Sequence, residues 1–264
     1  MKANQEPRIH DLMNTKDYQI IDAHCHIGSY YPIPVLYGDA DDLVAGMDRV
    51  GVEKICISSC IGISNDFFEG NNMVAQAIKK YPDRLIGMAS INANKKDSIE
   101  KELIRCFDEL EMSMIKLHPN FSGCPMTCDN YEIVYEFASE RKLAILNHSW
   151  QDYQLLDKLS EKYPDVRFIQ AHTAGGWGGK SKDMFLEVAR NKNNVFVDIA
   201  SSIAYYGAFE KLVEYLGPDK IIFGSDYPLQ SLEYQLGRVL YSDIGVKNKQ
   251  KILGENMLKV FRFS

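Results

Sequence analysis

The sequence predicts a single (β/α)8 barrel of the α/β class, and three observations support this fold. Short runs rich in β-branched residues alternate with longer runs whose apolar residues are three or four positions apart. The alternation repeats at intervals of roughly thirty residues, as in parallel βαβ units. The 264 residues suit one barrel of this kind, which typically needs about 250. An open doubly wound sheet is the alternative.

Eight predicted strands follow one another along the chain. Most of them are almost continuously apolar, which is typical of parallel strands buried on both faces. They cover residues 19–27, 52–60, 84–93, 112–118, 143–148, 166–172, 195–201 and 220–226. Proline and glycine signals precede several of them, as at Tyr81-Pro82-Asp83, and such signals end the preceding helix.

The predicted helices fill the intervals between the strands. In residues 42–50, for example, Leu43, Met47 and Val50 fall on one helical face. The other helices cover 73–81, 98–110, 131–141, 153–163, 184–191, 208–216 and 232–241, and an extra C-terminal helix over 249–261 is expected to pack across the barrel. Since no linker-like segment interrupts the pattern, we expect one domain over 1–264, with 1–17 as an N-terminal extension.

Composition and charge exclude several classes of protein. Hydrophobic residues make up 45% and charged residues 25%, which excludes a disordered, collagen-like or coiled-coil chain. A net charge of −6 argues against nucleic acid or an anionic membrane as a partner. The sequence shows neither a signal-peptide pattern nor an apolar run of membrane-spanning length. We therefore expect a cytoplasmic protein whose six cysteines are thiols.

Five of the six histidines fall in or at the ends of predicted strands, which in a barrel form the face that carries the chemistry. Because side chains alternate along a strand, His24 and His26 point the same way and can bind one ion. Imidazole with carboxylate suits Zn²⁺ or, less selectively, Mn²⁺, and such an ion lowers the pKa of a bound water. The set comprises His24, His26, His118, His148 and His172, with Asp226 closing the eighth strand.

Each of these histidines taken alone is equally well explained as a buried residue with a hydrogen-bond partner. Their joint position on one barrel face favours a metal site. His10 has no such context and is expected at the surface.

The same segments resemble a known family. Ile21-Asp22-Ala23-His24-Cys25-His26 resembles the Asp-x-His-x-His signature of the amidohydrolase superfamily. Further matches are Lys116-Leu117-His118-Pro119, Asn147-His148, Ala171-His172-Thr173, Gly224-Ser225-Asp226-Tyr227-Pro228 and Ile252-Leu253-Gly254-Glu255-Asn256-Met257. Together they are similar to the "amidohydrolase 2" branch of metal-dependent hydrolases, which is related to aminocarboxymuconate-semialdehyde decarboxylase.

This resemblance implies roles for the residues that match. His24, His26, His148 and Asp226 would hold one divalent ion, and Asp226 would also take the proton from a metal-bound water as general base. His172 would be a ligand or, preferably, a catalytic acid that polarises the substrate. Carried over by its position in the family pattern, His118 would contact the substrate or the metal-bound water. The resemblance also implies a homodimer.

Lys116 leaves two interpretations open. Superfamily members with two metals often bridge them through a carboxylated lysine on the fourth strand, where Lys116 lies. It shares the inward face of His118 but sits deeper in the barrel. We favour a single metal and a barrel-interior ammonium that pairs with a carboxylate such as Asp22 or Asp226, and we count Lys116 among the candidate substrate-binding residues.

Residues 174–181 nearly match a phosphate-binding loop, but Ala174 replaces the required first glycine. We expect a loop over the barrel mouth, with Lys180 and the following helix N-terminus binding a substrate carboxylate or phosphate rather than ATP. Trp177 is one of several aromatic residues expected around the mouth. Such residues favour a small, partly apolar or ring-containing substrate.

Three functions fit this sequence. The first is a metal-dependent hydrolase that directs an activated water at a small carboxylic acid, amide, ester or lactone. The second is a metal-dependent decarboxylase of an aromatic or muconate-like carboxylate; the two share fold and ligands, so the sequence does not separate them. The third is a non-catalytic metal-binding or ligand-binding barrel, which Asp226 argues against because a binding site needs no base.

Overall fold

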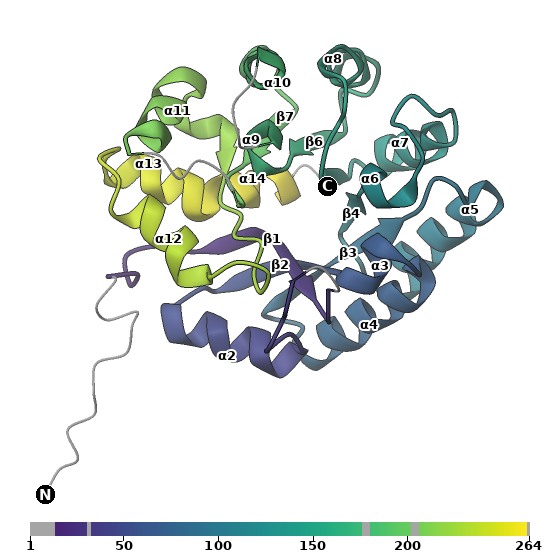
Figure 1. The fold of residues 1–264 in the computed structure, drawn as a ribbon, viewed down its shortest axis with the longest axis horizontal. Helices are drawn as coiled ribbons and strands as arrows, with labels where there is room; N and C mark the ends of the chain where they lie inside the picture. The colour runs from purple at the N-terminus through teal and green to yellow at the C-terminus, as the bar shows by residue number, and fades with distance from the viewer. Residues whose placement is uncertain (1–13, 31–32, 176–179, 202–205, 263–264) are drawn as a thin grey trace, which may run out of the picture.

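Eight parallel strands form the barrel that the sequence predicts, with helices around it (Figure 1). The computed structural model describes residues 14–30, 33–175, 180–201 and 206–262. The strands pair in chain order from first to last. They are β1 (Ile21–Ile27), β2 (Lys54–Ser59), β3 (Leu85–Ile91), β4 (Met114–Leu117), β5 (Ala144–Asn147), β6 (Arg167–Gln170), β7 (Val195–Asp198) and β8 (Ile221–Ile222).

Backbone hydrogen bonds between β1 and the segment that follows β8 close the barrel. The amide of Ala23 donates to the carbonyl of Phe223 at 2.9 Å, and that of His26 donates to Tyr227 at 2.7 Å. The amide of Asp226 in turn donates to the carbonyl of His24 at 2.8 Å. The open doubly wound alternative is therefore wrong, and closure places Asp226 directly beside the histidines of β1.

The main helices follow the predicted pattern. They are α2 (Ala40–Val50), α4 (Phe67–Lys80), α5 (Lys96–Ile104), α7 (Tyr131–Glu140), α8 (Tyr153–Lys162), α10 (Lys180–Asn191), α11 (Ala208–Leu216) and α12 (Leu232–Leu240). α4 begins before its predicted start at Met73, because the Asp66 carboxylate accepts from the amide of Glu69 and caps an earlier turn. In the described part of the chain, no helix combines the length and apolar character needed to cross a membrane.

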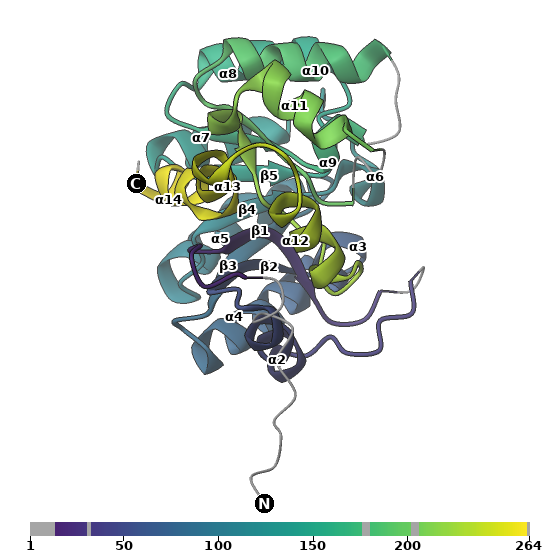
Figure 2. The same ribbon diagram turned by 90° about the vertical axis from the view of Figure 1, so that its left-hand side faces the viewer.

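Three short helices follow strands at the opposite end of the barrel from the C-terminal helix: α3 (Cys60–Ser64), α6 (Pro119–Ser122) and α9 (His172–Gly175). Figure 2 shows them on the right and the C-terminal helix on the left. Two glycines let α3 and α4 cross closely. A Cβ on Gly70 would lie 2.3 Å from the Cα of Gly62 and 2.4 Å from its nitrogen.

The C-terminal extra helix closes the end of the barrel where the strands begin. It comprises α13 (Val246–Gln250), a π-helical turn η3 (Lys251–Glu255) and α14 (Asn256–Arg262). Met257 and Val260 pack into the interior cluster of the barrel. The Asn256 amide group donates to the carbonyls of Pro218 and Ile221, at 2.7 and 2.8 Å, just before and within β8. The chemistry is thereby confined to the other end.

Candidate metal centre

The end of β1 brings two imidazoles to one carboxylate. The pairing of β1 with β2 shifts register between Asp22 and Cys25, and such a bulge re-aims the side chains around it. His24 and His26 are both buried here. Asp226 Oδ1 lies 3.6 Å from His24 Nε2 and 3.1 Å from His26 Nε2.

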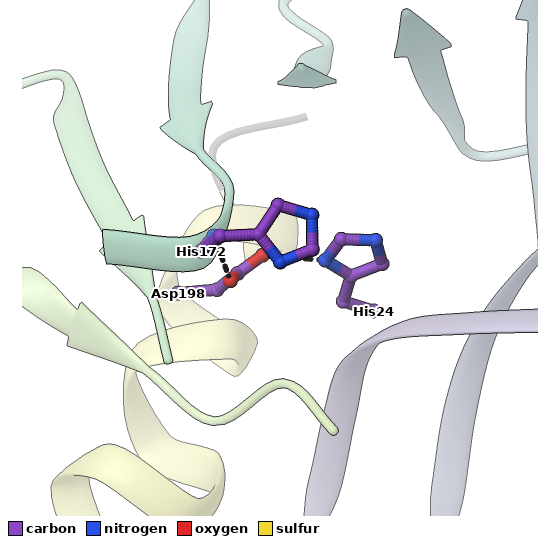
Figure 3. A group of neighbouring side chains, drawn as sticks. All are labelled: His24, His172 and Asp198. Carbon is purple, nitrogen blue, oxygen red and sulfur yellow. Dashed lines mark hydrogen bonds and ion pairs between the residues drawn. The ribbon is translucent and has the colours of Figure 1, made fainter. Parts of the chain in front are cut away.

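Two groups of metal-ligating side chains lie at this end of the described barrel, and both include His24. In the first, His24, His26 and Asp226 each offer a ligand atom within 4.8 Å of the others. In the second, His24 joins His172 and Asp198 in the same way (Figure 3). The first group contains three of the four ligands predicted from the sequence.

His148, the fourth predicted ligand, lies beside these groups rather than within them. Its Nδ1 is 3.0 Å from His172 Nε2, and its ring stacks on that of His118 with centroids 3.9 Å apart. His172 Nδ1 faces the carbonyl of Ala200 at 3.0 Å, and because a carbonyl only accepts, this nitrogen carries a hydrogen. In the form of His172 that carries a single hydrogen, Nε2 therefore accepts from His148 Nδ1, which leaves the lone pair of His148 on its Nε2.

Asp226 is held as an ionised carboxylate. Oδ1 meets His26 Nε2, and Oδ2 accepts from the hydroxyl of Ser201 at 2.6 Å. Burial alone would raise the pKa of Asp226, but the His26 hydrogen bond and the positive charges that His24 and His26 acquire only in acid outweigh it and hold the pKa well below its ordinary value. Asp226 is thus suited to bind a cation.

Lys116 is a buried cation whose hydrogen-bond partner is an imidazole. The side chain is 1% exposed, and its Nζ donates to His24 Nε2 at 2.7 Å. Burial lowers the pKa of Lys116 to about 8, against the opposing charges of Asp226 and Asp198. Asp22, one of the carboxylates expected to pair with Lys116, instead accepts at Oδ1 from the amides of His24 and Ser225, both at 3.0 Å.

Burial keeps four histidines at this end of the barrel neutral near pH 7. It lowers the pKa of His24 to about 4, with help from the charge of Lys116, and that of His148 to about 3. The pKa values of His26 and His118 are also lowered, again mainly by burial. Neutral imidazoles have a lone pair available for a cation, so these shifts suit a metal site.

The same shifts predict that the metal-free protein is sensitive to acid. Below pH 6.5, the histidines of the unfolded chain bind protons, whereas the buried histidines of the folded chain stay neutral. The free energy of unfolding therefore falls as the pH drops towards 4. Each buried histidine contributes up to about 1.4 kcal/mol per pH unit in this window. We expect the urea midpoint to fall between pH 7 and pH 5, and to fall less in His118→Phe. Equal pH dependence of this variant, the wild type and the control His10→Gln would contradict the assignment.

Four residues near the site adopt left-handed backbone conformations, although none is glycine. Their φ angles are 56° for His172, 49° for Thr173, 49° for Ser201 and 67° for Asp226. Such conformations cost about 1–3 kcal/mol each and persist where the surroundings hold them. Three strand ends, those of β6, β7 and β8, are therefore shaped by the site rather than by local preference.

Three side chains that support the ligands were not predicted from the sequence. Asp198 at the end of β7 faces His24, Ser201 donates to Asp226, and the Ser58 hydroxyl lies 3.1 Å from His26 Nδ1. Asp198 could have been found, because it is the single charged residue in the apolar run 195–201 at a strand end.

Three predicted residues lie wholly or partly outside the described residues. Trp177 falls in the gap at 176–179, and His10 precedes the first described residue. Lys180 begins α10, but its side chain is not among those described. Their predicted places, around the mouth for Trp177 and Lys180 and at the surface for His10, stay predictions.

A closed (β/α)8 barrel with buried histidines and an ionised aspartate at its mouth defines a class of metal-binding barrel enzymes. The family model described as Amidohydrolase (Amidohydro_2) matches residues 21–263. The chain therefore belongs to the amidohydrolase family and is an enzyme of that family, as the sequence motifs indicate.

Several similar proteins are decarboxylases. A 2-amino-3-carboxymuconate-6-semialdehyde decarboxylase of Dictyostelium discoideum is 22% identical over 232 residues, which cover 72% of this chain and 64% of that protein. The chain thus spans less than two thirds of this curated relative.

Solved structures with a similar fold also include decarboxylases. A dihydroxybenzoic acid decarboxylase from Polaromonas with bound manganese and an inhibitor is 16% identical with a TM-score of 0.75, covering 93% of this chain and 97% of that one. A 5-carboxyvanillate decarboxylase from Novosphingobium aromaticivorans, complexed with manganese, is 15% identical with a TM-score of 0.74, covering 94% and 97%. At these identities the likeness establishes the fold alone.

Proposed function

We propose that this protein is a metal-dependent decarboxylase of an aromatic or muconate-like carboxylate. The observation that carries the proposal is the geometry of Asp226, whose two oxygens are held by His26 and Ser201. Hydrolysis, the main function expected from the sequence, needs Asp226 as a base, and a carboxylate with both oxygens already hydrogen-bonded is poorly placed to take a proton from water. The decarboxylases among the similar proteins also favour this alternative.

The donor set fits one divalent ion. His24, His26 and Asp226 present two imidazole nitrogens and a carboxylate oxygen, and a cation, the ammonium of Lys116, already lies at His24 Nε2. This chemistry suits Mn²⁺ or Zn²⁺, and the manganese in two similar structures favours Mn²⁺. When bound, the ion supplies a fixed positive charge for the substrate's oxygens and for the negative charge that develops in the reaction.

Decarboxylation breaks the bond between a carbon and its carboxylate. The electron pair stays on that carbon, which takes up a proton, and carbon dioxide leaves. In our proposal His172 holds this proton at Nε2, because its Nδ1 is already committed to the carbonyl of Ala200. His148 Nδ1, at 3.0 Å from the same Nε2, accepts a hydrogen bond while His172 carries the proton and the hydrogen of His148 is on its Nε2. After the transfer, the hydrogen of His148 moves to Nδ1, through exchange with solvent, and Nδ1 then donates to His172.

Flat side chains beside the histidines offer a surface for a ring or a conjugated chain. The ring of His118 stacks between that of His148 and that of Phe121, whose centroid lies 4.3 Å away. Phe121 is 40% exposed, so it can meet a substrate at the mouth. We propose that Phe121 stacks on the substrate and that His118 supports the Phe121 ring from behind, while Lys116 balances the negative charge within the site.

Measured release of carbon dioxide tests this function. The protein is loaded with Mn²⁺ or Zn²⁺ and offered hydroxybenzoates, a carboxyvanillate and a carboxymuconate semialdehyde, alongside ester, lactone and amide substrates. We expect metal-dependent release of carbon dioxide from at least one carboxylate, and none from the metal-free protein or from His24→Ala. Hydrolysis of an ester, lactone or amide without decarboxylation of any carboxylate would overturn the proposal in favour of a hydrolase.

A further inference from the structure

Asp198 is a fully buried carboxylate at the end of β7 that joins two parts of the site (Figure 3). Its Oδ2 lies 2.8 Å from His24 Nδ1. Its Oδ1 accepts from the backbone amides of His172, at 2.8 Å, and Ala200, at 3.1 Å. Both oxygens are therefore used as acceptors by groups on three different segments.

The contact with His24 fixes where the imidazole carries its hydrogen. An ionised carboxylate only accepts hydrogen bonds, so the hydrogen of neutral His24 is on Nδ1 and the lone pair is on Nε2. Nε2 is the nitrogen that accepts from Lys116 and that lies 3.6 Å from Asp226 Oδ1. A nitrogen must be free of hydrogen to bind a metal ion.

We propose that Asp198 is a positioning residue that selects the metal-binding tautomer of His24. The inference rests on the divalent-ion part of the proposed function, in which His24, His26 and Asp226 are the ligands. It gives Asp198 a role in orienting His24 rather than in binding the ion. A histidine ligand that donates its other ring hydrogen to a carboxylate is a recurrent arrangement in metal sites. Here the chain supplies that carboxylate from the seventh strand and the imidazole from the first.

Two further observations indicate that the surrounding structure holds Asp198 and His24 together. Gly224 lies against both residues, since a Cβ at this position would be 3.0 Å from the Cβ of His24 and 3.2 Å from that of Asp198. In addition, the amide that donates to Asp198 Oδ1 belongs to His172, whose φ of 56° is left-handed. Asp198 therefore holds the backbone of the proposed proton carrier as well as the ring of His24.

Asp198→Asn tests the inference with a side chain of nearly the same shape. The amides of His172 and Ala200 need an acceptor, so the carbonyl oxygen of Asn stays with them and its NH₂ group faces His24 Nδ1. His24 then accepts at Nδ1, and its hydrogen moves to Nε2, where it opposes both Lys116 and a metal ion. We expect Mn²⁺ and Zn²⁺ to bind about 10–100-fold more weakly, while the folded structure is kept.

The tautomer itself is read without any metal. In ¹⁵N spectra of the metal-free protein labelled at histidine, His24 should carry its hydrogen on Nδ1 in the wild type and on Nε2 in Asp198→Asn. Asp22→Asn is the matched control, because Asp22 is equally buried but accepts from the backbone amides of His24 and Ser225. This control should keep the wild-type tautomer and the wild-type metal affinity.

The outcomes separate this inference from the proposed function. A wild-type His24 with its hydrogen on Nε2, or unchanged metal affinity in Asp198→Asn, overturns the role of Asp198. Equal weakening in Asp22→Asn and Asp198→Asn also overturns it, since the effect would then be a general consequence of replacing a buried carboxyl group. A wild type that binds neither ion defeats the proposed function, while the ¹⁵N measurement still decides which nitrogen Asp198 selects.

Discussion

Asp226→Asn is expected to lower kcat/KM for the proposed decarboxylation by about 10³-fold, which corresponds to about 4 kcal/mol of lost transition-state stabilisation. One oxygen of Asp226 lies within 3.6 Å of both His24 Nε2 and His26 Nε2, so it is the carboxylate of the ligand group. The neutral amide of Asn removes the negative charge that attracts a divalent ion. The Asn side chain also presents either its NH₂ group or its carbonyl oxygen to His26, and this oxygen is a weaker hydrogen-bond acceptor than a carboxylate oxygen.

Metal content and steady-state kinetics measure this effect together. The variant should bind Mn²⁺ or Zn²⁺ with less than a tenth of the wild-type affinity, and added metal should restore only part of the activity. Asp219→Asn is a control, because that carboxylate pairs with Lys251 and Lys259 far from the histidines. A metal-replete Asp226→Asn with more than half of the wild-type activity would show that the ion and the reaction do not need this charge.

Gly70→Ala is expected to destabilise the protein by about 3 kcal/mol, the upper end of the usual cost of overpacking. The new Cβ would lie 2.3 Å from the Cα and 2.4 Å from the nitrogen of Gly62, and these backbone atoms cannot rotate away. The helices α3 and α4 must move apart instead. At about 2–4 °C per kcal/mol for a chain of this size, the melting temperature should fall by about 6–12 °C.

Thermal and urea unfolding of Gly70→Ala and Gly207→Ala separate steric overlap from backbone strain. Gly207 adopts the left-handed conformation, with φ of 70° and ψ of 0°, but a Cβ there would meet nothing within 4 Å. Its substitution should cost about 1 kcal/mol through strain alone. Equal losses in the two variants would mean that the close helix crossing contributes nothing of its own.

Much of the fold could be predicted because buried parallel strands are apolar almost throughout. The boundaries were less accurate, and β8 shows why. The run 220–226 reads as one strand, but β8 covers only Ile221–Ile222, and the chain then turns at Asp226, with a φ of 67°. Hydrophobicity marks what is buried, whereas the turn at Asp226 depends on contacts with β1 and Ser201 that local sequence does not reveal.

The candidate site could be predicted where one strand or one motif carries the information. His24 and His26 follow from alternation on a single strand, and Asp226 from a motif. The ring of His148, in contrast, is oriented by His172, and the importance of Asp198 lies in its distance to His24. These relations join segments far apart in the sequence, so neither spacing nor composition contains them.

The hydrogen bond between His24 and Asp198 also has a consequence for how the chain reaches its folded state. The two residues are 174 positions apart, and His26 is 200 positions from Asp226. The site is therefore absent from any fragment that lacks either the first strand or the last two, and its contacts are among the least local in the chain. Because such contacts close large loops, they form late in folding. A refolding chain should bind the divalent ion of the proposed function only after the barrel has closed. The rate of ion uptake would then report the rate of this last step of folding.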